Sequence, residues 1–223
     1  MENISIFVGL ILIEFLFISI VSRFGKEWLY GSITLNLILI GLLGAKTIPL
    51  FGVVMNSGNV FYAGVFYATY LLIELHGKHE AIRSMWKSAV YVLLFLLMTH
   101  LVISTTGTAE SRVVDEAMHT LLDALPRVAG ASIAAFLIAQ FVNINLYAYL
   151  RKKTGTAKLW LRTAGAVVLG QAVDSIIFFP LAFLGVLASP NLLEITLTGF
   201  LAKVLIGFIG IPFLYLSMRL NSK

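Results

Sequence analysis

The chain has 223 residues, a formal net charge of +5 and no cysteine, and 59% of its residues are hydrophobic while only 12% are charged. This balance excludes a water-soluble domain, because so few charged side chains could not cover a soluble core, and it excludes disorder, which requires low hydrophobicity. The lack of cysteine excludes disulfides, thiolate nucleophiles and sulfur-bound metals. We therefore expect one integral membrane domain over residues 1–223.

Seven apolar runs predict membrane helices, because each approaches or exceeds the roughly 18 residues that a helix needs to cross a bilayer. In chain order they are Asn3–Val21, Tyr30–Val54, Asn59–Leu75, Ala89–Ser104, Val128–Leu150, Leu161–Leu187 and Leu193–Leu216. The predicted fold is all-α, a polytopic bundle of six to seven transmembrane helices. The first run has no basic residues before it and no small-residue cleavage site, so we expect a membrane helix rather than a cleaved signal peptide.

Arginine and lysine residues gather in every other connector. They follow the first, third, fifth and seventh runs, whereas the connectors Met55–Gly58 and Ala188–Leu192 have none. The positive-inside rule then predicts a protein of the cell (inner) membrane whose N-terminus lies outside and whose C-terminus is cytoplasmic. The same distribution assigns the net positive charge to lipid headgroups of the bilayer and argues against nucleic acid as a partner.

The connector from Thr105 to Pro126 is the one long polar segment. Its apolar residues recur at helical spacing opposite acidic ones: Val113, Val114, Met118, Leu121 and Leu122. This pattern predicts a short amphipathic helix on the outer surface of the membrane. Such a helix could stabilise the bundle as a cover or act as a gate.

Five ionisable residues lie within the predicted membrane segments: Glu14, Lys46, Glu74, Asp174 and Lys203. Each costs about 2.5–3.5 kcal/mol to insert, so each needs a partner or a function. One interpretation is a structural ion pair, of Asp174 with Lys203 or with Lys46. The other is a carboxylate that faces a cavity and accepts the N–H groups of a ligand.

Amide side chains accompany one of these acids. Gln171 lies three residues before Asp174, and Gln140 lies three residues before Asn143, so each pair shares a helix face. Amides in a membrane can hold helices together, or they can offer a planar heterocycle a donor and an acceptor at once. The sequence leaves both interpretations open.

Motifs for catalysis or nucleotide binding do not stand out. We find no HExxH, no P-loop and no convincing Ser-His-Asp arrangement. His76 and His79 with Glu80 could bind a metal, but two histidines at this spacing are common. We therefore expect no metal, no cofactor and no enzymatic activity.

A series of short motifs runs along nearly the whole chain. They are Phe24-Gly25-Lys26-Glu27, Lys46-Thr47 with Leu50-Phe51-Gly52, Gly58-Asn59 with Tyr62, Glu74 with Gly77-Lys78, Pro126-Arg127 with Ser132, Gln140, Leu159-Trp160-Leu161-Arg162, Gln171 with Asp174-Ser175, and Lys203 with Pro212. In order and spacing, the chain resembles the queuosine-precursor transporters, also called the VUT family of vitamin uptake transporters.

The resemblance implies import of deazaguanine bases that are used to make queuosine in tRNA. It implies a six-helix core similar to the membrane substrate-binding subunits of energy-coupling-factor transporters, with the first segment as an extra N-terminal helix. It also implies which residues line or support a substrate site: Asp174, Gln171, Gln140, Asn59, Glu74, Lys46 and Lys203.

The chain departs from the family pattern at several polar positions. Tyr70 and Asn143 stand where the family has Asp, Ala166-Val167 replaces Ser-Thr, and Gly41 replaces Asn. We include Tyr70 and Asn143 among the candidate substrate-binding residues. The departures predict either a changed substrate or a branch that no longer transports the usual base. Glu74 lies one turn from Tyr70, and its carboxylate is the candidate to replace that of the Asp which the family has at position 70.

We expect a membrane importer of a small planar nitrogenous compound, with a queuosine precursor as the best single candidate. In this hypothesis the base stacks on an aromatic side chain and its N–H edge is bound by Asp174 or Glu74. A binding subunit that needs a separate energising complex and a ligand-free membrane scaffold are the alternatives. Whether the protein forms a homo-oligomer stays open.

Overall fold

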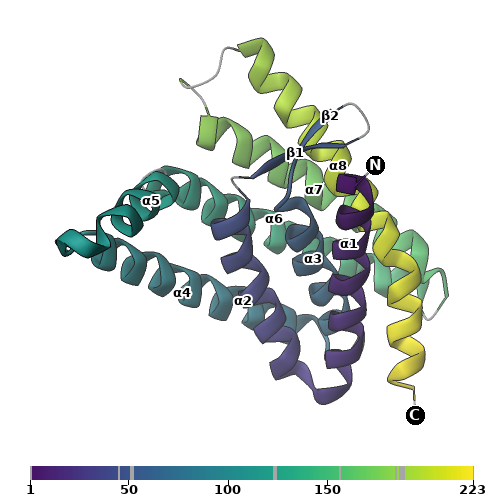
Figure 1. Ribbon diagram of the computed structural model, residues 1–223. Helices are drawn as coiled ribbons and strands as arrows, with labels where there is room; N and C mark the ends of the chain where they lie inside the picture. Colours follow the sequence, from purple (N-terminus) through teal and green to yellow (C-terminus); the bar gives the residue numbers. More distant parts are fainter. Residues whose placement is uncertain are drawn as a thin grey trace.

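The computed structural model describes residues 2–44, 46–50, 53–122, 125–155, 157–183, 185 and 189–222. The helices in this part of the chain are α1 (Glu2–Val21), α2 (Lys26–Leu43), α3 (Asn59–Leu75), α4 (Lys78–Ile103), α5 (Arg112–Leu122), α6 (Leu125–Thr154), α7 (Leu159–Phe183) and α8 (Ser189–Leu220), with the 3-10 turns η1 (Ser22–Phe24) and η2 (Ala109–Ser111). They form one helical bundle (Figure 1), which confirms the predicted all-α fold.

Five helices among the described residues are long and apolar enough to cross a membrane: Asn3–Phe24, Lys78–Ile103, Gly130–Thr154, Leu159–Phe183 and Leu192–Leu220. The other two are shorter. α3 has 17 residues, and α2 has 18, of which Lys26 and Glu27 are charged. At 1.5 Å per residue, both are close to the roughly 30 Å of a hydrocarbon core. The chain is therefore a multi-pass membrane protein.

The second predicted segment is wrong in its latter half. α2 ends at Leu43, and an antiparallel hairpin of β1 (Thr47–Leu50) and β2 (Val53–Asn56) follows, with Thr47 opposite Asn56. Pro49 has no N–H group and restricts the residue before it to extended conformations, so a helix cannot continue here. The motif residues Phe51 and Gly52 lie outside the described residues, as does Leu187, where we expected the sixth segment to end.

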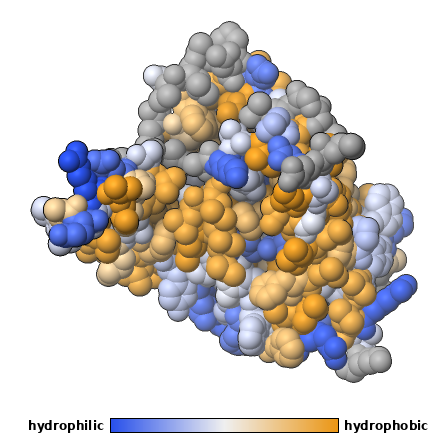
Figure 2. Space-filling view, in the orientation of Figure 1, coloured by the Kyte–Doolittle hydropathy of each residue, from blue (hydrophilic) through white to orange (hydrophobic). Residues whose placement is uncertain are grey.

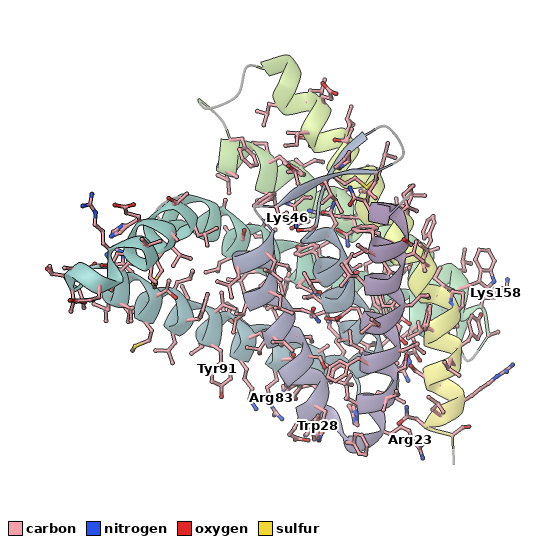
Figure 3. The ribbon with its side chains drawn as sticks, viewed as in Figure 1. Arg23, Trp28, Lys46, Arg83, Tyr91 and Lys158 are labelled. Atoms are coloured by element: carbon pink, nitrogen blue, oxygen red, sulfur yellow. The ribbon has the colours of Figure 1, made fainter. Side chains whose placement is uncertain are left out.

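The hairpin changes the position of Lys46. This lysine is exposed and lies in the segment between α2 and β1, toward the end of the bundle opposite to Arg23 (Figure 3). The sequence predicted Lys46 inside a membrane helix, and this prediction is wrong. Asn56 fixes the turn locally, because its side-chain amide donates to the backbone oxygen of Gly44 and its Oδ1 accepts from the N–H of Gly58 at 2.6 Å.

α3 is the central helix. Fifteen of its 17 residues are buried, which is typical of a helix that is surrounded by others. α1, α2, α4, α6 and α8 all pack against it. The first helix is thus part of the core rather than an appendage: Phe15 of α1 is fully buried and meets Tyr67 of α3 edge to face, with ring centroids 5.0 Å apart.

α5 extends to one side of the bundle, and its main contacts in the described part of the chain are with α4 and the η2 turn (Figure 1). It is a helix as predicted, and none of its residues is buried. Val113, Val114 and Leu121 are exposed, Val113 to 78%. Figure 2 shows polar side chains at the tip of this extension and apolar ones over the middle of the bundle.

Two basic side chains mark one end of the bundle. Arg23 after α1 and Arg83 at the start of α4 both lie at the end where the C-terminus is found, opposite to the N-terminus (Figures 1 and 3). Basic residues from two of the segments that the sequence predicts on one side of the membrane therefore lie at one end of the bundle. An odd number of crossings agrees with this arrangement.

Close packing of α7 on α8 generates a stability prediction. A Cβ at Gly207 of α8 would lie 2.7 Å from Val167 Cγ1 of α7, whereas a Cβ at Gly9 of α1 would meet nothing within 4 Å. We expect Gly207→Ala to lower the melting temperature in detergent, because overpacking costs about 1–3 kcal/mol. The control Gly9→Ala should leave it unchanged or raise it, since alanine is the better helix former by roughly 1 kcal/mol. Equal effects of the two substitutions would contradict the packing.

Candidate functional site

One face of α3 carries a row of large side chains. Tyr62, Phe66, Tyr70 and Glu74 recur every four residues and so lie one above another. The rings form a ladder, with centroids 5.3 Å apart between Tyr62 and Phe66 and 6.4 Å apart between Phe66 and Tyr70. Tyr147 of α6 continues it by stacking on Tyr70 at 4.6 Å. The row spans 12 residues, or about 18 Å of helix.

α7 faces this row in the opposite direction. Three of its residues meet three residues of α3 in reverse order: Asp174 with Tyr62, Gly170 with Phe66, and Arg162 with Glu74. The absence of a side chain at Gly170 makes the middle contact possible, since a Cβ there would lie 2.7 Å from Phe66 Cε1. An ionic cluster thus closes each end of an aromatic ladder.

The first cluster, the Asp174 cluster, joins α3, α7 and α8. Lys203 Nζ lies 2.6 Å from Asp174 Oδ2, and the hydroxyl of Tyr62 donates to Asp174 Oδ1. The ammonium group of Lys203 also lies over the ring of Tyr62, 4.7 Å from its centroid. All three side chains are buried. The pair is neutral in sum, which is how a buried charge is tolerated.

The second cluster, the Glu74 cluster, joins α3, α6 and α7. Arg162 Nε lies 2.8 Å from Glu74 Oε1, and Arg151 Nε lies 3.3 Å from Oε2. The hydroxyl of Tyr147 donates to Oε1 at 2.9 Å. Arg151 also donates to the backbone oxygens of Ile73 and Glu74, at 2.5 and 3.0 Å, and so satisfies carbonyls that the end of α3 leaves without a helical partner.

A chain of amides crosses from α6 to α3 between the two clusters. The hydroxyl of Tyr70 donates to Asn143 Oδ1 at 3.1 Å, Asn143 Nδ2 donates to Gln140 Oε1 at 3.3 Å, and Gln140 Nε2 donates to Thr69 Oγ1 at 3.0 Å. Gln140 and Asn143 therefore hold helices together, one of the two roles that the sequence left open for them.

Gln171 differs from the other amides. It is 0% exposed, yet neither Nε2 nor Oε1 has a hydrogen-bond partner among the described residues. The hydroxyl of Ser175, one turn further along α7, is also buried and unpaired. Buried polar groups without a partner cost about 1–3 kcal/mol each, so native proteins normally fill such positions with water or a ligand.

Eight of the nine residues that the sequence predicted for a site are buried: Asn59, Tyr70, Glu74, Gln140, Asn143, Gln171, Asp174 and Lys203. The structure resolves the pairing of Asp174 in favour of Lys203 and against Lys46, which is exposed and makes no ion pair in the described part of the chain. Asn59 opens α3 one turn before Tyr62.

Four partners in the clusters were not identified from the sequence: Tyr62, Tyr147, Arg151 and Arg162. Both arginines belong to a basic connector and were interpreted as anchors at the membrane surface. Arg162 nevertheless carried a signal, because it is the second residue of the predicted apolar run Leu161–Leu187. A cation within such a run indicates a buried partner, which here is Glu74.

The Asp174 cluster yields a test of the ion pair. We expect Lys203→Met to lower the melting temperature strongly, because breaking a buried pair costs about 3–5 kcal/mol when one charge is left behind. The double variant Asp174→Leu with Lys203→Met should recover much of that loss, since no unpaired charge remains. Lys152→Met, at an exposed lysine near the end of α6, is the control. A single variant as stable as the native protein would show that the pair does not hold α7 to α8.

Comparisons with known proteins identify the family of the chain. The family described as "Putative vitamin uptake transporter" matches residues 56–217, which include both clusters and the amide chain. A protein of Bacillus subtilis (strain 168), described as a probable queuosine precursor transporter, is 30% identical over 224 residues, which are 99% of this chain and 96% of that protein. No solved structure matches the chain. The protein is a membrane transporter of a small molecule, and the chain belongs to the vitamin uptake transporter family.

Proposed function

We propose that this transporter imports a small planar nitrogenous compound, and that its substrate is a deazaguanine precursor of queuosine. The name of the Bacillus subtilis relative supports this substrate class. The observation that carries the proposal is the buried amide of Gln171, whose donor and acceptor are both unpaired among the described residues.

An amide suits the edge of a heterocyclic base. It offers one donor group and one acceptor side by side, which is the complement of a base edge that carries an N–H and a carbonyl oxygen. The hydroxyl of Ser175 adds a further unpaired group on the same face of α7. An apolar vitamin would leave these groups unpaired, so the site favours a polar heterocycle.

Aromatic rings supply the flat surface that a base needs. Phe66 contacts α7 at Gly170, the residue before Gln171, and Tyr62 lies next to Phe66. Tyr70 is less suited, because one face of its ring is already stacked on Tyr147. We therefore place the base against Tyr62 and Phe66, with its polar edge on Gln171.

In this proposal Asp174 exchanges one of its present hydrogen-bond donors for an N–H group of the base. Its two carboxylate oxygens already accept from Tyr62 and Lys203, so an N–H group of the base must replace one of these donors. Glu74 is held more firmly, by two guanidinium groups and the hydroxyl of Tyr147. Of the two acids that the sequence proposed for the N–H edge, we assign Asp174.

Two of the departures from the family pattern, Tyr70 and Asn143, meet at one contact. Tyr70 and Asn143 both stand where the family has Asp, and they hydrogen-bond to each other at 3.1 Å. A neutral contact thus replaces two acids beside the ladder. We expect the transporter to bind a base with fewer cationic or N–H groups than its relatives bind, because fewer carboxylates are available to accept them.

Ligand binding to the purified protein tests the proposal. A compound that binds only the folded state raises its melting temperature with concentration, by about 2.7 kcal/mol of stability at 100 times Kd. We expect a deazaguanine base to give such a shift, and vitamins to give none. Gln171→Leu should abolish the shift while the ligand-free protein stays as stable as the native one or becomes more stable, since a buried unpaired amide is removed.

Two controls separate a binding role from a structural one. Ser84→Ala removes another buried unpaired hydroxyl, on α4, and should keep the ligand shift. Asp174→Asn should weaken the binding of the base. If Gln171→Leu destabilised the protein and left the ligand shift intact, the amide would be structural and the proposed site would be wrong.

The orientation in the cell membrane is also proposed, with the N-terminus outside and the basic connectors in the cytoplasm. Because the chain has no cysteine, single cysteines can report it. We expect a membrane-impermeant maleimide to label Thr106→Cys, beyond α4, in intact cells. It should label Lys153→Cys, at the end of α6, only after permeabilisation. The reverse labelling pattern would invert the orientation.

A further inference from the structure

Glu14 is the membrane acid that neither cluster uses. It lies in the middle of α1, the helix that packs on α3 and α8, and it is partly buried. No lysine or arginine forms an ion pair with it among the described residues, in contrast to Glu74 and Asp174. A lone carboxylate at this depth is costly as an anion.

Its partner is an amide on α2. Asn36 is 2% exposed, and its Nδ2 donates to Glu14 Oε1 at 2.7 Å. The other atom of this amide, Oδ1, is buried and has no donor among the described residues. The contact therefore satisfies one half of the amide and leaves the other half unpaired.

A proton on Glu14 would complete the contact. A carboxylic acid has one O–H donor and one acceptor, and a primary amide has the same pair in the opposite order. Protonated Glu14 could accept from Asn36 Nδ2 and donate to Asn36 Oδ1 at the same time. Rotating the amide by half a turn changes nothing in this respect, because Oδ1 would then face Oε1 and would again need a proton between them.

The backbone of α3 leaves space for this carboxyl group. A Cβ at Gly64 would lie 2.5 Å from Glu14 Oε1 and 3.1 Å from Asn36 Nδ2. Any side chain at this position would displace the pair. α1, α2 and α3 thus form a fitted pocket for one carboxyl group and one amide.

Other titratable groups on the elements around α1 either have partners of their own or are exposed to the surroundings of the bundle. On α3, the hydroxyl of Tyr67 is bonded to Ser19 and Ser217, and on α8 Lys203 is bonded to Asp174. On α2, Lys26 pairs with Glu80 of α4, and Glu27 is exposed at the start of the helix. On the hairpin side, Lys46 is exposed before β1. Arg219 is exposed near the end of α8.

A groove lies between α1 and α2, beside the first half of α2. It has a volume of about 330 Å³ and is lined by Phe17 of α1 and by Glu27, Trp28, Gly31, Ser32 and Leu35 of α2. Phe17 lies three residues after Glu14, and Leu35 is the neighbour of Asn36. Glu14 and Asn36 are not among its lining residues, and Phe17, Trp28 and Leu35 are exposed, so the groove lies on the outer face of the two helices.

We propose that Glu14 and Asn36 form a proton-binding site, and that a proton bound there is the coupling ion of the transporter. Glu14 takes up one proton as a carboxylate and releases it as a carboxylic acid, with no other bond made or broken. The second half of this proposal, coupling, rests on the proposed import function, whereas the first half does not.

Infrared spectroscopy of the purified protein in lipid tests the proton site without a substrate. We expect a protonated carboxyl band that appears as the pH is lowered and is absent in Glu14→Gln. The matched control Glu194→Gln, at an exposed glutamate of α8, should keep the band. Glu14→Gln should fold normally, because glutamine offers Asn36 the same donor and acceptor as the protonated acid.

Two further variants guard against an indirect effect. Asn36→Leu should shift the frequency of the Glu14 band, because the hydrogen bond between the Asn36 amide and the carboxyl group is lost. Gly64→Ala should shift it as well, since the new methyl group displaces the carboxyl. A band that persists in Glu14→Gln, or a carboxyl that responds to Na⁺ and not to pH, would overturn the proton site.

Uptake into proteoliposomes tests the coupling. With a deazaguanine base that raises the melting temperature, an inward proton gradient should accelerate native uptake and should have no effect on Glu14→Gln, which still binds the base. Native uptake that is indifferent to the gradient overturns the coupling. If no base binds or enters, the proposed function fails, and the infrared result still decides whether Glu14 binds a proton.

Discussion

Pairing of buried charges is the constraint on which the bundle depends. A charge that cannot reach water must meet an opposite charge and enough hydrogen bonds, or its helix does not insert stably. Glu74 shows the consequence, because it draws two arginines from the end of α6 and the start of α7 against the end of α3. Asp174 does the same at the other end with Lys203. The aromatic ladder and the amides between them follow from these two fixed ends.

The polar residues inside the bundle divide into two kinds. Gln140, Asn143 and Tyr70 bond to one another and to α3, so they contribute to the fold. Gln171 and the Oδ1 atom of Asn36 are buried without partners among the described residues. A fold gains nothing from burying a polar group in this way. These two groups are the positions at which we propose that the protein binds a base and a proton.

Much of this arrangement could be predicted from the sequence. α3 has the predicted bounds, and the pairing of Asp174 with Lys203 was one of two expected outcomes, because apolar runs and isolated charges are strong signals in a membrane protein. The hairpin after α2 was missed because a buried helix and a buried strand can both consist of an apolar run, and composition does not separate them. Arg162 was missed because a basic residue at a segment end also fits the membrane surface.

The two ionic clusters hold the two ends of α3 with different numbers of polar contacts. The Asp174 cluster joins α3 to α7 and α8 through one lysine and one tyrosine. The Glu74 cluster joins α3 to α6 and α7 through two arginines and a tyrosine. Arg151 also donates hydrogen bonds to backbone oxygens of α3. The clusters lie about 18 Å apart along α3. The end of α3 at Glu74 is therefore held by more polar contacts than the end at Asp174.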